Sequence, residues 1–256
     1  MISPCIRCLN ALHPSSFQTL LSGHMVDHMI TDPPFLLFTS RRAPSARARK
    51  LDSGEVVRFA SSAAYADFTG QWLSAATPHV KRSGTLVIFS NALGRQCIVA
   101  AAQQLGWLLE GSIPWAKYAS RAPPRPSSTS NEVLLRIYEH ALVFRTARTA
   151  RPPSPLATGG NLALLSAYTE EGGGSSHPHE KPLSALAPLL THFTAAGEVV
   201  LDPFSGSGAI AVAAQAHGRV GVGMELRPDW ARQAHQRLQG CVERNNALST
   251  TTKPTV

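Results

Sequence analysis

Residues 199–208 read VVLDPFSGSG, an apolar run followed by an Asp-Pro pair and a glycine-rich turn. The run at 197–201 predicts a buried strand, and the alanine-rich segment at 206–218 predicts a helix that begins at the glycines. A second strand is expected at 219–226, followed by a helix from 227 to 238 with Pro228 near its start. This unit is the clearest α/β segment of the chain and predicts how the C-terminal third folds.

The N-terminal part repeats the alternation of strands and helices. Strands are expected at 26–31 and 84–90, and helices at 65–76 and 92–106. Strands that alternate with helices are typical of a parallel sheet covered by helices on both faces. The 256 residues, 43% of them hydrophobic, therefore predict one main α/β domain.

Two of the expected strands end in an Asp-Pro pair, at Asp32 in MITDPPF and at Asp202 in VVLDPF. A residue before proline is disfavoured in the helical region and proline lacks an N–H, so each aspartate should lie extended where strand pairing stops. In an open parallel sheet, ligands bind outside the carboxyl ends of the strands. We therefore expect both aspartates at one crevice, with Asp32 facing it rather than the core.

An acidic residue, Glu225, follows the second C-terminal strand, 19 residues after Gly206. In nucleotide-binding sheets, a carboxylate about 20 residues after the glycine turn binds ribose hydroxyls. Gly206 and Gly208 would let a ligand approach the backbone at a helix N-terminus. Dinucleotide-dependent oxidoreductases share this pattern, although their third glycine is missing around Val212, and a purely structural tight turn is a further alternative.

The chain is strongly basic, with a formal net charge of +8 and a pI of about 9.8. Six basic and two acidic residues fall within 41–58, which gives this segment a net charge of +4. Clustered arginine favours a phosphate-bearing partner, and hence a nucleic acid, over a merely soluble basic protein. A disordered basic arm is the alternative for these arginines. Five residues are expected to contact the phosphates of double-stranded DNA: Arg41, Arg42, Arg47, Arg49 and Lys50.

No apolar run approaches the length of a membrane span, and Arg7 interrupts the N-terminus where a secretory signal would be apolar. We therefore expect a cytoplasmic protein with no membrane partner. The four cysteines do not form a disulfide framework. Cys5 and Cys8 have the spacing of half a zinc site, but only His13 lies nearby, so reduced thiols are favoured and no metal is expected.

Three motifs in a fixed order, TDPPF at 31–35, HPHEKP at 177–182 and LDPFSGSG at 201–208, resemble those of the amino-group DNA methyltransferases of the permuted, beta-type class. The similarity extends over residues 9–240 and includes strands at 105–117 and 138–144. It implies a circularly permuted, Rossmann-like fold that binds S-adenosylmethionine, with a mostly parallel seven-stranded sheet. A homodimer would also agree with this family.

The resemblance divides the domain into two halves. Residues 1–145 would be the catalytic half, including the basic loop at 36–60, and residues 177–244 the cofactor-binding half. The segment 146–176, rich in Pro, Gly, Ser and Thr, would be a short target-recognition insert. Residues 245–256 would be a flexible tail.

The resemblance also implies a cofactor pocket built around the second Asp-Pro corner. Glu225 would bind the ribose, and Lys181 and Pro182 would close the pocket beside the cofactor carboxylate. The alternative for Lys181 is a solvated lysine ahead of a helix that begins at Pro182. His177 and His179 are expected to be loop histidines rather than metal ligands. The full cofactor-binding set is Asp202, Pro203, Phe204, Ser205, Gly206, Gly208, Glu225, Lys181 and Pro182.

The catalytic residues implied by the resemblance are Asp32, Pro33, Pro34 and Phe35. An exocyclic amine is a poor nucleophile because its lone pair is delocalised into the base. The Asp32 carboxylate and the Pro33 carbonyl can each accept an N–H, which favours a pyramidal nitrogen whose lone pair points at the sulfonium methyl. Phe35, where the family more often has tyrosine, can stack on a base flipped out of the duplex. The transfer would be direct, without a covalent intermediate.

Aspartate at position 32 favours adenine as the target, because the members that modify the cytosine amine more often have serine there. A cytosine amine, an RNA substrate and a non-catalytic DNA-binding subunit are the alternatives. Methylation at carbon 5 of cytosine is not favoured, since the only Pro-Cys pair, Pro4-Cys5, lies outside any strand-end crevice. Trp72, Trp107 and Trp115 sit in apolar stretches and are expected in the core.

Overall fold

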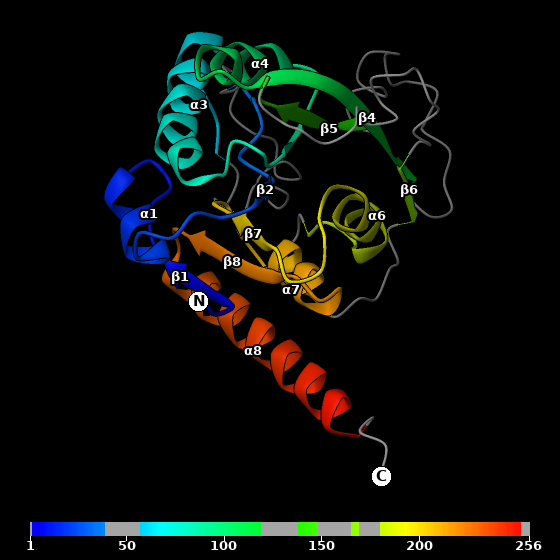
Figure 1. Cartoon of the computed structure of the whole chain (residues 1–256). Helices are drawn as coiled ribbons and strands as arrows, with labels where there is room; N and C mark the ends of the chain where they lie inside the picture. The colour runs from blue at the N-terminus through cyan, green and yellow to red at the C-terminus, as the bar shows by residue number, and fades with distance from the viewer. Residues whose placement is uncertain (1, 39–56, 119–137, 148–164, 169–179, 252–256) are drawn as a thin grey trace, which may run out of the picture.

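The computed structural model describes residues 2–38, 57–118, 138–147, 165–168 and 180–251 (Figure 1). The five basic residues expected to contact phosphates, both loop histidines and most of the expected insert lie outside these ranges. The elements in chain order are β1 (Cys5–Cys8), α1 (Pro14–Leu21), β2 (His28–Thr31), α3 (Ser62–Ala76), β3 (Leu86–Ser90), α4 (Arg95–Gln104), β4 (Leu108–Tyr118), β5 (Tyr138–Arg145), β6 (Leu165–Tyr168), α6 (Leu183–Phe193), β7 (Val199–Asp202), α7 (Ala209–Ala216), β8 (Val220–Glu225) and α8 (Pro228–Thr251).

The described strands form one eight-stranded sheet, in the order β1-β8-β7-β2-β3-β5-β4-β6. Their pairings are parallel except for those of β5, which runs antiparallel to both β3 and β4. The eighth strand, β6, lies at one edge and comes from the segment predicted to be the recognition insert. The mostly parallel α/β fold is therefore confirmed, with one strand more than the seven expected.

Helices cover both faces of the sheet, as the alternation of strands and helices predicts. Met29 and Ile88 pack into a cluster with α1, α3 and α4 on one face. Their neighbours in sequence, Ile30 and Val87, pack into a second cluster with α6 and α7 on the other face. Successive side chains of a strand point to opposite faces, so these central strands need apolar residues at every position.

Several side chains can be compared directly with their expected positions. Trp72, Trp107 and Trp115 are buried in the core, as their apolar surroundings predict. Cys5 and Cys8 lie in β1, at the edge of the sheet opposite to β6. Among the residues that the structure describes, no three metal-binding side chains lie close enough together to hold an ion.

The helices differ from expectation mainly at the two ends of the chain. Neither β1, which has four residues, nor α1, which has eight, was predicted from the sequence. Pro14 at the start of α1 and the helical spacing of its buried residues Phe17, Leu20 and Leu21 were the available signal. At the other end, α8 continues to Thr251, and the Asn245 side chain donates to the Gln215 carbonyl at 2.8 Å. The tail predicted to be flexible from residue 245 is thus helical as far as 251. None of the helices in the described ranges has the length and apolar composition to cross a bilayer.

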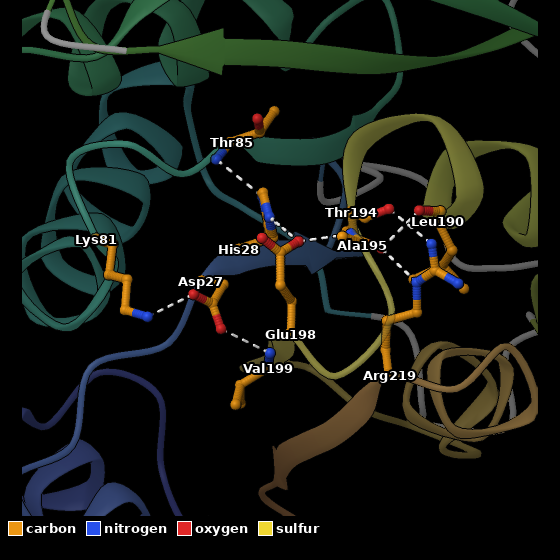
Figure 2. A network of polar contacts seen from close by, with 10 residues as sticks. All are labelled: Asp27, His28, Lys81, Thr85, Leu190, Thr194, Ala195, Glu198, Val199 and Arg219. Carbon is orange, nitrogen blue, oxygen red and sulfur yellow. Dashed lines mark hydrogen bonds and ion pairs between the residues drawn. The ribbon is translucent and has the colours of Figure 1, made fainter. Parts of the chain in front are cut away.

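The half predicted to be catalytic and the half predicted to bind the cofactor meet at β2 and β7, which pair in the middle of the sheet (Figure 1). A polar network joins the amino ends of these strands (Figure 2). Asp27 accepts hydrogen bonds from Lys81 Nζ at 2.5 Å and from the Val199 N–H at 2.8 Å, and His28 Nε2 lies 2.9 Å from Glu198 Oε2. This network ties the halves together at the end of the strands opposite to the Asp-Pro corners.

Candidate active site

The two Asp-Pro corners lie next to each other at the carboxyl ends of β2 and β7. The strands are parallel and in register, with Met29 opposite Leu201. The Thr31 hydroxyl, at the end of β2, donates to Asp202 Oδ1 at 2.7 Å, and both residues are buried. Positions 171 residues apart in the sequence are therefore in direct contact. The expected juxtaposition of Asp32 with the second corner is present.

Only 1% of the Asp202 surface is exposed. Asp202 is therefore buried more deeply than the sequence led us to expect for an acid at an open crevice. Burial raises the pKa of Asp202 to about 7, and the charges of Asp32 and Glu225 add to the rise, while hydrogen bonds from Thr31 and the Phe204 N–H oppose it. Its second oxygen, Oδ2, is buried without a hydrogen-bond donor among the described residues. A buried acceptor of this kind suits a ligand that supplies a donor or a positive charge.

The turn after Asp202 has two glycines in the left-handed region of the backbone. Gly206 and Gly208 have φ values of +50° and +79°, and residues other than glycine rarely adopt such values. A Cβ at Gly208 would lie 2.9 Å from Ile6 Cδ1, and a Cβ at Gly223 would lie 2.0 Å from Ser205 Oγ. The missing side chains thus allow β8, the turn and the first strand to approach closely.

Glu225 lies beside this turn, at the end of β8. Its Oε2 accepts the Gly206 N–H at 3.0 Å and its Oε1 accepts the Arg227 N–H at 2.9 Å. The carboxylate is therefore fixed where the sequence predicts ribose binding. Phe204 packs its ring edge-on against Trp72, with the centroids 5.3 Å apart, and remains partly buried.

Lys181 is buried, which excludes the alternative of a solvated lysine. Its side chain is 6% exposed and forms ion pairs with Asp32 Oδ2 and, at 3.1 Å, with Glu139 Oε2. Burial lowers the pKa of Lys181, but the two carboxylates outweigh this effect and hold it above its ordinary value. The residue expected beside the cofactor thus contacts the expected catalytic acid. Pro182 directly precedes α6 and is its N-cap.

Three aromatic rings surround the Lys181 ammonium group. The distances from Nζ to the ring centroids are 5.2 Å for Phe35, 5.1 Å for Phe89 and 5.4 Å for Trp115. These distances are within the range of cation–π attraction. One ammonium therefore links the carboxylate of Asp32 to the ring of Phe35, the two side chains expected to hold the target base.

Other side chains at the site were not found from the sequence. Asn91 donates to the Leu36 carbonyl at 3.0 Å and accepts the Gly94 N–H at 2.9 Å, which anchors the chain just after the first corner. Its place directly after β3 was the available signal, since ligand-binding residues follow such strands. Arg237 of α8 binds both oxygens of Glu180 at 2.9 and 2.7 Å, and no local pattern predicts this pair.

Comparison with known proteins identifies the family. Residues 26–236 match the family model N6_N4_Mtase, which is described as DNA methylase. YubD of Escherichia coli (strain K12), which is named as a methylase, is 31% identical over 222 residues, covering 84% of this chain and 83% of YubD. The type II methyltransferase M2.DpnII of Streptococcus pneumoniae is 25% identical over 248 residues, which are 91% of each chain. The chain therefore belongs to this family of DNA methylases.

Solved structures share the fold. M1.HpyAVI in complex with SAM superposes with a TM-score of 0.63 at 20% identity, covering 91% of this chain and 98% of that one. The cytosine-N4-specific PvuII DNA methyltransferase gives a TM-score of 0.62 at 14% identity, covering 94% of both chains. The arrangement of strands and helices is therefore that of known DNA methyltransferases.

Proposed function

We propose that the protein transfers a methyl group from S-adenosylmethionine to the exocyclic amine of adenine in duplex DNA. One observation carries the proposal: the Asp-Pro-Pro-Phe corner of β2 and the Asp-Pro-Phe-Ser-Gly corner of β7 meet at one end of the sheet, joined by the Thr31–Asp202 hydrogen bond. The first corner offers acceptors for an amine, and the second offers a turn for a nucleotide-like cofactor. Membership of the DNA methylase family supports this assignment.

At the first corner, the chain can orient a nucleophile. Asp32 and the Pro33 carbonyl would accept the two N–H groups of the amine, so that its lone pair points away from the base ring. Phe35, held on one side by Lys181, would stack on the flipped base. Most of the rate would come from this alignment, because the reaction needs no covalent enzyme intermediate.

At the second corner, the described residues fit S-adenosylmethionine. This cofactor supplies a methyl group on a positively charged sulfur. Glu225 lies at the end of β8, where it would accept hydrogen bonds from ribose hydroxyls. The buried Asp202 Oδ2 would accept a donor from the bound molecule, and the bare backbone at Gly206 and Gly208 would allow close approach.

The choice of base follows from the first corner. Aspartate at position 32, rather than serine, supports adenine. The amine of cytosine is the second candidate, because the matching family model is named for both N6 and N4 methylation. RNA is the alternative nucleic acid, and the phosphate-binding role proposed for the basic residues at 41–50 does not distinguish it from DNA.

A direct test measures tritiated methyl incorporation into duplex DNA and RNA of the same sequence. We expect incorporation into DNA by the wild type, and a loss of at least about 100-fold in Asp32→Ala because the amine loses its charged acceptor. Asp67→Ala, on the exposed side of α3, is the matched control and should remain active. A preference for RNA would replace DNA as the substrate, and an active Asp32→Ala would refute the role of the first corner.

A further inference from the structure

Glu139 is a buried acid that the proposed reaction does not yet use. It is 6% exposed and contacts Lys181 Nζ at 3.1 Å. Burying a carboxylate costs free energy, and even a paired one rarely stabilises a fold more than an apolar residue would. A functional role is therefore the more direct explanation for Glu139 at this site. The ammonium group that pairs it also pairs Asp32.

The direction of β5 explains how Glu139 reaches the site. β5 is antiparallel to β3, so the first residues of β5 lie beside the carboxyl ends of β2 and β3. Glu139 pairs with Trp115 of β4, and Ala141 and Val143 continue along the same face into the cluster beneath α6. The Glu139 side chain therefore lies on the face of the sheet that α6 covers. Lys181, two residues before α6 begins, reaches the site from the same face.

Lys181 divides its charge between two carboxylates. Its ammonium group pairs with Asp32 and with Glu139, so Asp32 receives only part of the stabilisation that this one cation can give. If Glu139 were neutral, Lys181 would be free to neutralise Asp32 alone. The acceptor strength of Asp32 toward a substrate amine therefore depends on Glu139.

We propose that Glu139 is a positioning residue for methyl transfer: by sharing Lys181, it fixes the ammonium beneath Phe35 and keeps negative charge on Asp32 available to the target amine. This inference rests on the proposed function. Glu139 acts through Lys181 and is not expected to touch the base or the cofactor.

The test compares Glu139→Gln with a matched variant of the same two strands. Glu110 of β4 forms a comparable but only partly buried pair with Arg145 of β5, with Oε2 and Nε 2.9 Å apart, at the other end of these strands. Glu110→Gln thus removes one carboxylate from a partly buried pair far from the corner. We expect Glu139→Gln to lower kcat about 10- to 100-fold with KM values for DNA and S-adenosylmethionine nearly unchanged, and Glu110→Gln to leave kcat unchanged.

The pH profile separates positioning from a general loss of structure. Among the residues that the structure describes, Asp202 and Tyr65 also interact electrostatically with Asp32, and neither is altered in this variant. Removing the negative charge of Glu139 should make Asp32 harder to protonate, so the acid limb of kcat should move down by about 1 pH unit. Glu139→Asp keeps the charge with a shorter reach and should retain the wild-type acid limb, which also provides a test if Glu139→Gln folds poorly.

The possible results are distinct. A wild-type kcat in Glu139→Gln, an equal loss in Glu110→Gln, or a loss without a shift of the acid limb would each overturn the inference. A Glu139→Asp acid limb displaced like that of Glu139→Gln would overturn it as well. In all four cases methyl transfer by the wild type would leave the proposed function intact, whereas a wild-type protein that transfers no methyl would remove the basis of both.

Discussion

The hydrogen bond between Thr31 and Asp202 gives the sharpest prediction, because it joins the two halves at the proposed site. Thr31→Val keeps the shape of the side chain and removes only the hydroxyl, so no cavity forms. Both residues are buried, and the bond is 2.7 Å long. A hydrogen bond to a charged group contributes about 1.5–3 kcal/mol and a neutral one about 1 kcal/mol.

Since the pKa of Asp202 is raised to about 7, the carboxylate is mostly ionised at pH 8.5 and mostly protonated at pH 5.5. We expect Thr31→Val to lower the free energy of unfolding by about 2 kcal/mol at pH 8.5 and by about 1 kcal/mol at pH 5.5. The loss should grow with pH, because the hydroxyl stabilises the charged form.

The assay is urea unfolding at the two pH values, followed by calorimetry with S-adenosylmethionine at pH 7.5. The hydroxyl lowers the pKa of Asp202, so its loss should raise that pKa further and weaken cofactor binding. Thr19→Val, at an exposed position of α1, is the matched control and should change neither quantity. A Thr31→Val protein as stable as the wild type at pH 8.5 would refute the idea that this bond holds the corners together.

Three further predictions use other groups. Asp202→Asn should be more stable than the wild type above pH 7 and should lose cofactor affinity. The pKa of Asp202 is about 7 in the folded protein and about 3.8 in the unfolded chain, so the free energy of unfolding of the wild type falls as the pH rises between these values. In urea unfolding, the difference between variant and wild type should therefore vanish toward pH 4. Burial raises the pKa of Asp27, but hydrogen bonds from Lys81 and a backbone N–H outweigh this effect and hold that pKa below its ordinary value. The ionised Asp27 therefore stabilises the fold above about pH 4, and this stabilisation is lost as the pH falls through the folded pKa. Because Lys81 is 48% exposed, Lys81→Met should cost less than about 1 kcal/mol at pH 7 and nothing at about pH 2, as measured by unfolding at both pH values. Gly208→Ala and Gly197→Ala share the strain of a positive φ, but only the first places a Cβ against a side chain, at 2.9 Å, so it should destabilise by about 1–3 kcal/mol more in parallel urea titrations.

The parts of the fold that follow from local pattern were predictable. Apolar runs that end in Asp-Pro placed Asp32 and Asp202 at strand ends, and the glycines at 206 and 208 indicated the turn between β7 and α7. Weakly patterned elements were missed, because β1 and β6 have four residues each and gain their stability from pairing with a neighbouring strand.

The charge network of the site could not be derived from the sequence. Lys181 and Asp32 are 149 residues apart, and only the strand order brings them together. Glu139 is the second residue of β5, a strand that packs apolar side chains on both faces. Such a strand has no alternation of polar and apolar residues from which the direction of the Glu139 side chain could be predicted. Its partner became apparent only when the antiparallel direction of β5 was known.

The central claim is that the two corners form one site for methylating an amine on DNA. The most direct measurement is mass spectrometry of nucleosides from duplex DNA incubated with S-adenosylmethionine and either the wild type or Asp32→Ala. The account predicts N6-methyladenine with the wild type and none above background with the variant. N4-methylcytosine instead would contradict the assigned base, and no methylated nucleoside from a folded, cofactor-binding protein would contradict the claim itself.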